Sequence, residues 1–438
     1  MANTYLTRTS GSPTNSYKWT YSFWVKIGDL STSDDTFLLD FNTDDNNRSN
    51  IGFNSSQQLV VYEKVSGSTS QLFTSNRLFR DRNAWYHIVV SCDRTLSTAG
   101  DRTKIYINGV QETSWASQTN PAQNTTGIIN TAVNTLIGKY SQNTYYFNGC
   151  LSHVHFVDGT AYPASTFGST DATTGEWTIN TSPTITMGNN GFTILKDGNT
   201  ITDQSSNSNN FTLGGGTLTN TEDCPDNVFC TMNPLDNYYT VNTFSNGNTT
   251  VTTPSVGYSG AIGSMGASSG KYYFEFKPIS KTGDADEYVV GISAQSVHSV
   301  NQPHYKMSLG YMYTGVNGNK INNDSSSSYG NTFTAGDIIG VAMDLDNLKL
   351  YFSKNGTWQT SGDPTSGSTG TGAAFTLTSP TSDASLLAFS TGYYLPCCAF
   401  VANSAGATMS FNFGNGFFGT TAISSEGTNA SGIGKFEY

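Results

Sequence analysis

Residues 18–27 read KWTYSFWVKI, and this stretch decides the fold class. Every second side chain is large and apolar, namely Trp19, Tyr21, Phe23, Val25 and Ile27. Polar side chains fill most of the alternate positions. Because successive side chains of a strand point to opposite faces, this period of two predicts a strand with one face in a core.

Similar runs recur along the chain and are separated by turn residues. They are FLLDF (37–41), IGFNSSQQLVVY (51–62), AWYHIVVSCD (84–93), KIYINGVQE (104–112), KYYFEFKP (271–278), EYVVGIS (287–293) and GDIIGVAMDLDNLKLYFSKNGTW (336–358). Asn108-Gly109 and Asn355-Gly356 are the dipeptides that favour two-residue hairpin turns. We find no helical period longer than about two turns. The pattern predicts an all-β protein.

Composition agrees with this prediction and bounds the number of domains. Charged residues make up 12% of the chain, against about 25% in an average protein. Helices normally carry many charged residues on their outer face, and this chain has few. A single core rarely grows beyond about 250–300 residues, so 438 residues predict two domains. We place them at 1–168 and 255–420, with an ordered polar connector at 169–254 and a C-terminal tail at 421–438.

The first block resembles the laminin-G-like, concanavalin A-like module. The matching runs are Tyr21-Ser22-Phe23-Trp24-Val25-Lys26, Trp85-Tyr86-His87-Ile88-Val89-Val90, Lys104-Ile105-Tyr106-Ile107-Asn108-Gly109 and Ile137-Gly138. The resemblance implies an antiparallel β-sandwich of jelly-roll type. Residues 191–213 resemble the segment that normally opens such a module. We therefore expect this segment to pack back onto the first sandwich and complete it.

The second block resembles a SPRY module, which is also a β-sandwich. The matching runs are Gly270-Lys271-Tyr272-Tyr273-Phe274-Glu275-Phe276, Val290-Gly291-Ile292-Ser293, Gly336 to Asp344 and Leu350 to Gly356. The fold expected for the whole chain is therefore two antiparallel β-sandwich domains.

The whole chain is similar to a group of virion proteins from tailed phages of marine bacteria. The shared features are Asn233-Pro234-Leu235-Asp236-Asn237, the stretch from Phe147 to Gly159, and the ending Gly432 to Tyr438. This resemblance implies a place on the particle surface, as head decoration or tail fibre, with capsid or tail proteins as partners. We also expect a homo-oligomer.

Charge and hydropathy exclude two classes of partner. The formal net charge is 21 − 32 = −11, and no Lys/Arg cluster reverses it locally, so nucleic acid is not an expected partner. No stretch approaches about 18 apolar residues, so no membrane insertion is expected. The N-terminus shows neither a charged nor an apolar signal region, so we expect another exit route, of which release inside a virus particle by lysis is one.

Catalysis is not expected. Glycoside hydrolysis needs two carboxylates about 5–9.5 Å apart. The relevant concanavalin A-like family carries them in a Glu-x-Asp-x-x-Glu strand motif, which is absent from this chain. Asp344 and Asp346 form an Asp-x-Asp pair, but Asp346-Asn347 fits a turn better. We therefore expect a protein without enzymatic activity and without a required cofactor.

The sequence suggests two metal-binding sites, each with a structural alternative. Asp34, Asp35, Asp44 and Asp45 flank the strand at 37–41 and supply the hard oxygen ligands that Ca²⁺ prefers; the alternative is a solvated acidic loop. His153 and His155 are spaced i, i+2 in a strand and suit a transition metal, but packed side chains are the alternative. Cys224 and Cys230 are close enough in sequence for a disulfide, and their pairing stays open.

Glycan binding is the ligand function that we consider. Exposed aromatic rings stack on sugars, and the candidates are Tyr140, Tyr145 and Tyr146 in the first block and Tyr305, Tyr311, Tyr313 and Tyr329 in the second. The alternative is aromatic packing or subunit contact. The expected function is a virion surface protein that binds host polysaccharide. The other functions considered are a secreted bacterial lectin or glycan-processing protein, and a purely architectural cement or fibre protein.

Overall fold

The computed structural model describes residues 3–28, 35–142, 145–196, 198, 200–239, 242–254, 257–281, 287–295, 303–381, 390–402, 406–427, 432 and 434–438. The chain forms two compact units, 1–228 and 229–438. Helical structure in the described part is confined to short 3-10 turns, at Ala99–Asp101, Ala164–Thr166, His304–Lys306, Gln359–Ser361 and Gly367–Thr369. No helix among these residues is long and apolar enough to cross a membrane. The all-β prediction is confirmed.

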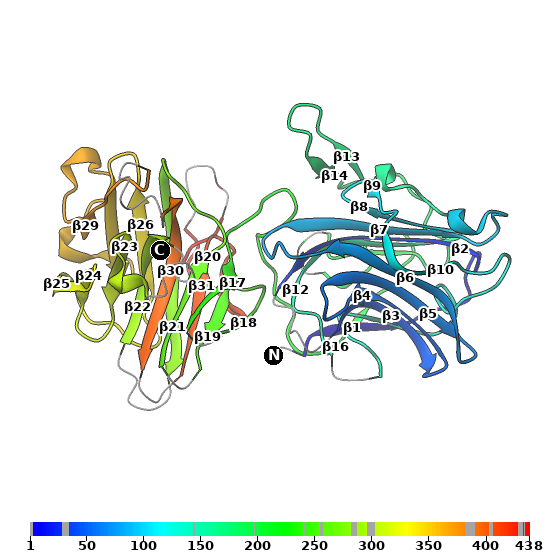
Figure 1. Cartoon of the computed structure of the whole chain (residues 1–438). Coiled ribbons are helices and arrows are strands. Elements are labelled where there is room, and N and C mark those ends of the chain that lie inside the picture. The colour runs from blue at the N-terminus through cyan, green and yellow to red at the C-terminus, as the bar shows by residue number, and fades with distance from the viewer. Residues whose placement is uncertain are drawn as a thin grey trace. The chain divides into compact units, whose positions relative to one another are not determined.

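Unit 1 is a sandwich of two antiparallel sheets, which Figure 1 shows as two layers. We name each sheet after one of its inner strands. The β3 sheet contains, in lateral order, β10 (Trp115–Thr119), β6 (Ser68–Leu78), β5 (Gln58–Val65), β4 (Asn47–Phe53), β3 (Thr36–Asp44), β11 (Asn134–Ile137), β1 (Tyr5–Thr9) and β16 (Thr212–Gly215). The β2 sheet contains β15 (Phe192–Ile194), β12 (Gly149–Asp158), β2 (Lys18–Ile27), β7 (Trp85–Asp93), β8 (Thr103–Ile107) and β9 (Val110–Gln111).

The strand that decided the fold class is buried on both faces. The apolar set beginning with Trp19 lies in the core between the sheets, as the alternation predicts. The opposite face, which the alternation marks as the polar one, is buried as well, because residues 160–187 cover it. That covering segment includes the hairpin β13 (Gly168–Thr170) and β14 (Trp177–Ile179), and Phe167 packs with Val89 and Val157 there.

Residues 191–213 lie on the first sandwich. Strand β15 pairs with β12, and β16 pairs with β1. Phe192, Ile194 and Phe211 join the core between the two sheets. The chain then reaches Asp223, whose carboxylate accepts hydrogen bonds from the buried Lys26 ammonium (2.6 Å) and from Trp85 Nε1 (2.9 Å).

The stretch expected to be a connector is therefore divided between the two units. Residues 169–228 belong to unit 1, and 229–254 belong to unit 2. In unit 2 these residues form β17 (Met232–Tyr239), β18 (Thr243–Ser245) and β19 (Thr250–Thr252), each of which joins a sheet. Sequence reasoning placed a connector here because the apolar runs are short, but edge strands need few core side chains.

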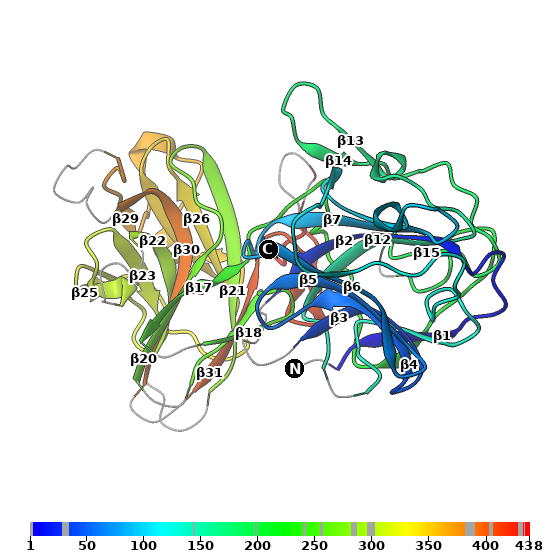
Figure 2. The same cartoon turned by 45° about the vertical axis from the view of Figure 1, so that its right-hand side comes forward.

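Unit 2 is a second antiparallel sandwich, shown from two directions in Figures 1 and 2. The β30 sheet contains β17, β20 (Gly257–Gly263), β30 (Ser390–Ala402), β22 (Glu287–Gln295), β23 (Gly310–Thr314), β24 (Asn319–Asn322) and β25 (Ser325–Ser328). The β21 sheet contains β18, β19, β31 (Ala407–Asn412), β21 (Lys271–Lys281), β26 (Ile339–Asp344), β27 (Lys349–Lys354) and β28 (Thr357–Trp358), with β29 (Phe375–Thr376) also paired to β27.

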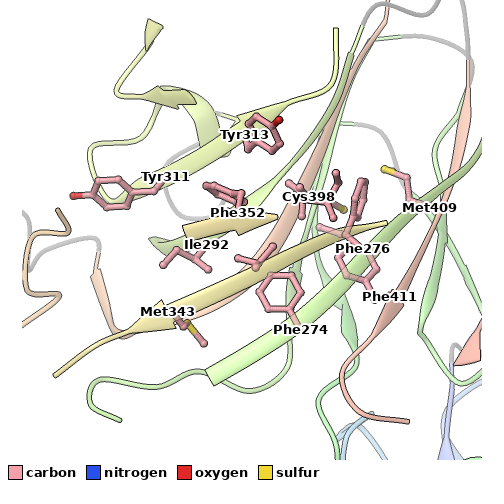
Figure 3. Packing of buried hydrophobic residues seen from close by; sticks show 14 of the residues in the cluster. Phe274, Phe276, Ile292, Tyr311, Tyr313, Met343, Phe352, Cys398, Met409 and Phe411 are labelled. Atoms are coloured by element: carbon pink, nitrogen blue, oxygen red, sulfur yellow. The ribbon is translucent and has the colours of Figure 1, made fainter. Parts of the chain in front are cut away.

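The core of unit 2 lies between these sheets. Figure 3 shows Phe274 and Phe276 of β21 packed with Phe411 of β31 and with Ile292 of β22.

Tight turns form in both units where the sequence predicts them. Asn108-Gly109 and Asn355-Gly356 have positive φ at both positions, as a two-residue hairpin turn of type I′ requires.

The end of the chain is part of unit 2. A short hairpin, β32 (Phe417–Phe418) and β33 (Thr421–Ala422), follows β31, and residues 434–438 return to the β21 sheet. The 421–438 stretch is therefore not a separate tail, because the backbone of its last residues is hydrogen-bonded to β21 and neighbouring loops.

The way in which residues 191–228 complete unit 1 predicts the outcome of a fragment experiment. A fragment of residues 1–228 should unfold cooperatively in urea, monitored by tryptophan fluorescence. A fragment of residues 1–168 should not, because it lacks both of these edge strands, the four core side chains Phe192, Ile194, Leu195 and Phe211, and Asp223. Cooperative unfolding of the shorter fragment at the same urea midpoint would contradict this account.

Candidate functional site

The candidate site is a polar groove in unit 1 where β1 meets two loops of the completing segment. It encloses about 570 Å³, a volume in the range of small-molecule sites. The lining residues are Thr7, Arg8, Thr9, Gly11, Ser12, Asn189, Asn190, Ser208, Asn209, Asn210 and Thr212. Residues separated by nearly 200 positions in the sequence therefore share one surface.

Arg8 is the charged residue of this lining. Its Nη2 donates to Asn209 Oδ1 at 2.6 Å, and its Nη1 lies 3.4 Å from the carbonyl oxygen of Asn190 and 3.5 Å from Ser10 Oγ. Burial lowers the pKa of the Arg8 guanidinium, and the nearby Asp203 carboxylate opposes that shift. A guanidinium has five N–H donors, so Arg8 is anchored by one short bond and keeps donors for a ligand.

Asp158 fixes the first loop of the groove. Its carboxylate accepts hydrogen bonds from the backbone N–H groups of Thr14 (2.6 Å), Asn15 (3.2 Å) and Asn190 (3.1 Å), and from Asn130 Nδ2 (2.7 Å). Asp158 is 2% exposed. Such a buried carboxylate with four donors is a structural anchor, not a free acid or base.

Asp203 fixes the second loop in the same way. It accepts hydrogen bonds from the N–H groups of Thr193 (2.9 Å), Ser205 (2.9 Å) and Asn209 (2.8 Å), and from Ser205 Oγ (2.8 Å). The amide that holds Arg8 is thus positioned by the same buried carboxylate that lies near the guanidinium. Loops held by this many hydrogen bonds give the groove a preformed shape.

The lining determines what the groove can do chemically. Its side chains offer amide and hydroxyl groups, which both donate and accept hydrogen bonds, together with one fixed cation. Among the described lining residues there is no Asp, Glu, His, Cys or aromatic residue. The arrangement suits recognition of a polyhydroxylated ligand and offers no general acid or base.

The three tyrosines predicted in the first block lie in the stretch of chain between β11 and β12. Two of them are covered by cations: the Arg48 guanidinium lies 5.5 Å from the centre of the Tyr140 ring, and Lys139 Nζ lies 5.6 Å from that of Tyr146. Tyr140 is also only 9% exposed, and its ring stacks on Phe37. Tyr145 is half-buried. These rings make cation–π and aromatic contacts within the fold, which is the alternative considered for them.

The tyrosines predicted in the second block are mostly core residues. Tyr311 is 4% exposed and Tyr313 is fully buried, and Figure 3 shows both in the core cluster. They are not exposed stacking rings, which corrects the prediction. Tyr329 packs partly buried against the same cluster, and Tyr305 packs on a smaller one on the other side of the β30 sheet. Two of the four tyrosines proposed for unit 2, Tyr311 and Tyr313, are therefore unable to stack on a ligand.

The predicted calcium ligands are not brought together. Asp35 and Asp44 lie at opposite ends of β3, about 30 Å apart along a strand of this length. Asp44 caps the turn after β3 by accepting from the N–H groups of Asn46 and Asn47, and Asp45 pairs with Arg48. Asp34 lies outside the described residues. Within the described part of the chain, no group of three or more His, Cys, Asp or Glu is placed to hold a metal ion.

The histidines of β12 are buried and serve packing. A β-bulge between Ser152 and His155 offsets His153 from simple strand alternation. His155 Nδ1 lies 2.9 Å from Thr193 Oγ1, and burial lowers the pKa of His155 to about 3. His155 is therefore neutral at ordinary pH.

Cys224 and Cys230 are not joined, since all six cysteines are free thiols.

Asp40 is the one carboxylate of the β3 sheet whose burial sets a clear pH dependence. It is 0% exposed, its Oδ2 accepts from the Ser141 N–H (3.0 Å), and its Oδ1 has no hydrogen-bond partner among the described residues. Burial raises the pKa of Asp40 from 3.8 to about 6, against the lowering effects of the Ser141 hydrogen bonds and of the Arg48 charge. The ionised form is therefore less favourable in the folded state.

Asp40→Asn should make unit 1 more stable at high pH. Well below the ordinary carboxyl pKa of 3.8 the group is protonated in both states, so the variant and the parent should match. As pH rises from about 3 to about 6 mainly the unfolded state ionises, so the parent loses up to about 3 kcal/mol relative to the variant, with a nearly constant difference above about pH 7. Urea unfolding of both proteins at about pH 3, 6 and 8 tests this. Equal stability of Asp40→Asn and parent at pH 8 would refute the assignment.

Sequence reasoning missed the groove. The residues Asn189 to Asn210 have the turn-rich composition of any loop, and nothing local links them to Arg8. The one available signal was the expectation that residues 191–213 complete the first sandwich.

Two domain families match the chain. Residues 1–165 match the Concanavalin A-like lectin/glucanases superfamily, in its laminin-G form, and residues 271–416 match the SPRY domain. Similar curated proteins are Ran-binding protein 9 of Danio rerio, 39% identical over 92 residues, and the Ran-binding proteins 9/10 homolog of Drosophila melanogaster, 37% identical over 92 residues. Each match covers 20% of this chain, and 15% and 9% of those proteins, respectively.

Two solved structures are similar to parts of the chain. The SPRY domain of human HERC1 is 23% identical, covers 41% of this chain and 96% of its own, and has a TM-score of 0.32. The heptameric SAP-like pentraxin from Limulus polyphemus is 15% identical, covers 37% of this chain and 72% of its own, and has a TM-score of 0.28. By its family matches, the chain combines an N-terminal concanavalin A-like domain of the laminin-G type with a C-terminal SPRY domain.

Proposed function

We propose that the chain is a non-catalytic binding protein that takes a glycan in the groove of unit 1. The observation that carries this proposal is the chemistry of the lining: amides, hydroxyls and one anchored arginine, with no titratable acid or base among the described lining residues. Sugars present many hydroxyl groups that each donate and accept a hydrogen bond. The match to a superfamily described by its lectins and glucanases supports the same class of ligand.

The rigid mounting of the groove supports binding as well. Asp158 and Asp203 hold its two loops, so few side chains have to be ordered when a ligand arrives. Binding without such ordering avoids a cost of about 0.5–1.5 kcal/mol for each immobilised side chain. The aromatic rings first expected to contact sugars are not needed in this arrangement.

Glycan binding in the groove should depend on the charge of Arg8 and on the groove not being filled by a larger side chain. Screening the full chain against neutral and uronic-acid-containing oligosaccharides by thermal shift, then titrating the hits, should identify a ligand. Arg8→Ala should weaken its binding at least tenfold, because the fixed cation is lost, and Thr9→Trp should block it, because Thr9 is an exposed lining residue.

Arg80→Ala, an exposed arginine of unit 1 outside the groove, is the matched control and should bind as the parent does. Binding that survives both groove substitutions would place the glycan elsewhere. A complete absence of glycan binding, together with tight attachment to phage capsids, would favour the purely architectural function.

We further propose that the chain works on the surface of a tailed-phage particle, as head decoration or tail fibre, and contacts other virion proteins there. This part is supported by the sequence resemblance at Phe147 to Gly159, Asn233 to Asn237 and Gly432 to Tyr438. The SPRY similarity spans only a small part of the Ran-binding relatives, so it supports protein contacts by unit 2 but names no partner.

Immunogold labelling tests the particle location. An antibody raised against unit 1 should label intact, purified particles of the parent phage, and the position of the label should distinguish head from tail. Particles that carry no label while the lysate supernatant contains the protein would instead favour a secreted lectin.

A further inference from the structure

The segment Lys435–Tyr438 lies on unit 2 in a fully hydrogen-bonded form. All four of its backbone N–H groups donate to other parts of unit 2. The bonds are Lys435 N to Gly414 O (2.8 Å), Phe436 N to Gly427 O (2.9 Å), Glu437 N to Glu275 Oε2 (3.0 Å) and Tyr438 N to Glu275 Oε1 (2.9 Å). Asn412 Nδ2 donates to the carbonyl oxygen of Lys435 (2.8 Å). The segment is thus recognised through its backbone.

Glu275 is the centre of this recognition. It lies in the middle of β21 between Phe274 and Phe276, which point into the core, so its carboxylate is on the outer face of the sheet. It is 0% exposed, and it also accepts from Asn412 Nδ2 (3.0 Å) and Tyr273 Oη (3.2 Å). No lysine or arginine of the described residues forms an ion pair with it. Two successive peptide N–H groups therefore take the place of a cation.

The side chains of Phe436, Glu437 and Tyr438 also contact unit 2. Phe436 is 8% exposed and its ring lies 5.1 Å from that of Tyr273 in an edge-to-face arrangement. The Glu437 carboxylate accepts from Ser424, through both its N–H and its hydroxyl group. Tyr438 lies against Gly356, where an added Cβ would come within 2.7 Å of its ring. The acceptor surface therefore buries the aromatic ring of Phe436 and contacts one side of Tyr438, which stays 51% exposed.

The segment is attached as a bound peptide would be. It forms isolated bridges, Asn415 with Lys435 and Gly427 with Phe436, and is not a strand of either sheet. Glu275, Asn412 and Tyr273 belong to β21 and β31, which pair directly with each other through their own backbones. Removing the segment would leave a buried carboxylate without two of its donors, a state that favours recapture of an equivalent peptide.

We propose that this surface, which we call the Glu275 acceptor, is a peptide-binding site occupied in cis by Lys435–Tyr438, and that it takes the same segment from a second copy of the chain when the cis segment is displaced. The recognised chemistry is an extended peptide with a buried aromatic residue followed by two residues that present free backbone N–H groups. This inference is independent of the groove in unit 1.

The experiment uses a fluorescein-labelled peptide of sequence GKFEY, acetylated and amidated, and fluorescence anisotropy. The chain lacking residues 435–438 should bind it saturably, and the complete chain should not, because its acceptor is filled. The full-length Phe436→Ala variant, whose cis segment loses the Tyr273 contact, should also bind the peptide. This second variant keeps the test valid where the shortened chain fails to fold.

Backbone recognition gives a matched pair of control peptides. N-methylation at the position of Glu437 removes a donor to Glu275 and should weaken binding at least tenfold. N-methylation at the position of Gly434, whose N–H makes no hydrogen bond in the described structure, should leave binding unchanged. Glu275→Gln in the shortened chain should likewise weaken binding at least tenfold while its melting temperature stays within a few degrees.

Three results would overturn the proposal. The first is a shortened chain that remains folded yet fails to bind the peptide at millimolar concentration. The second is equal loss of binding from N-methylation at either position. The third is a folded Phe436→Ala chain that does not bind the peptide.

Discussion

One late segment of the chain supplies an edge strand to each sheet of unit 1. β15 closes one edge of the β2 sheet and β16 closes one edge of the β3 sheet, so residues 192–215 terminate both layers at once. An open sheet edge is a row of unpaired donors and acceptors. The core contacts of Phe192 and Phe211, the anchoring of the loops by Asp203 and the walls of the polar groove all depend on this closure.

Buried carboxylates take over where regular pairing stops. Asp158 and Asp203 each accept several backbone N–H groups in unit 1, and Glu275 does so in unit 2. Glu63 accepts from the N–H of Ile128 and pairs with the fully buried Arg94 at 2.5 Å. In a chain with so few charges, these buried carboxylates hold irregular segments in place, because an ionised acceptor forms stronger hydrogen bonds than a neutral one.

Patterns over a few neighbouring residues correctly predicted the strands, the tight turns and the two domain types. The alternation around Trp19 identified a core strand, the Asn-Gly turns fell where expected, and both domain types were recognised from short runs. Tyr311 and Tyr313 were expected to be exposed rings, but both lie in strand β23 and their side chains pack into the core between the sheets.

The groove and the separation of Asp35 from Asp44 follow from how segments are placed in space, which a strand-by-strand analysis does not provide. The acidic residues near β3 are close in sequence but separated by the length of an extended strand. Arg8 and Asn209 are 201 positions apart and share a 2.6 Å hydrogen bond. For the acidic residues near β3 and for Arg8 with Asn209, separation in the sequence therefore did not predict distance in the structure.

The pairing of Thr7 with Thr212 also has a consequence in time. These residues are 205 positions apart, so at about 5–20 residues per second the ribosome needs roughly 10–40 s to supply the partner of β1. During that interval one edge of β1 stays open to any other strand, including one from a neighbouring nascent chain. Crowded synthesis, with many nascent chains on one messenger RNA, is thus the condition under which unit 1 is most exposed to mispairing.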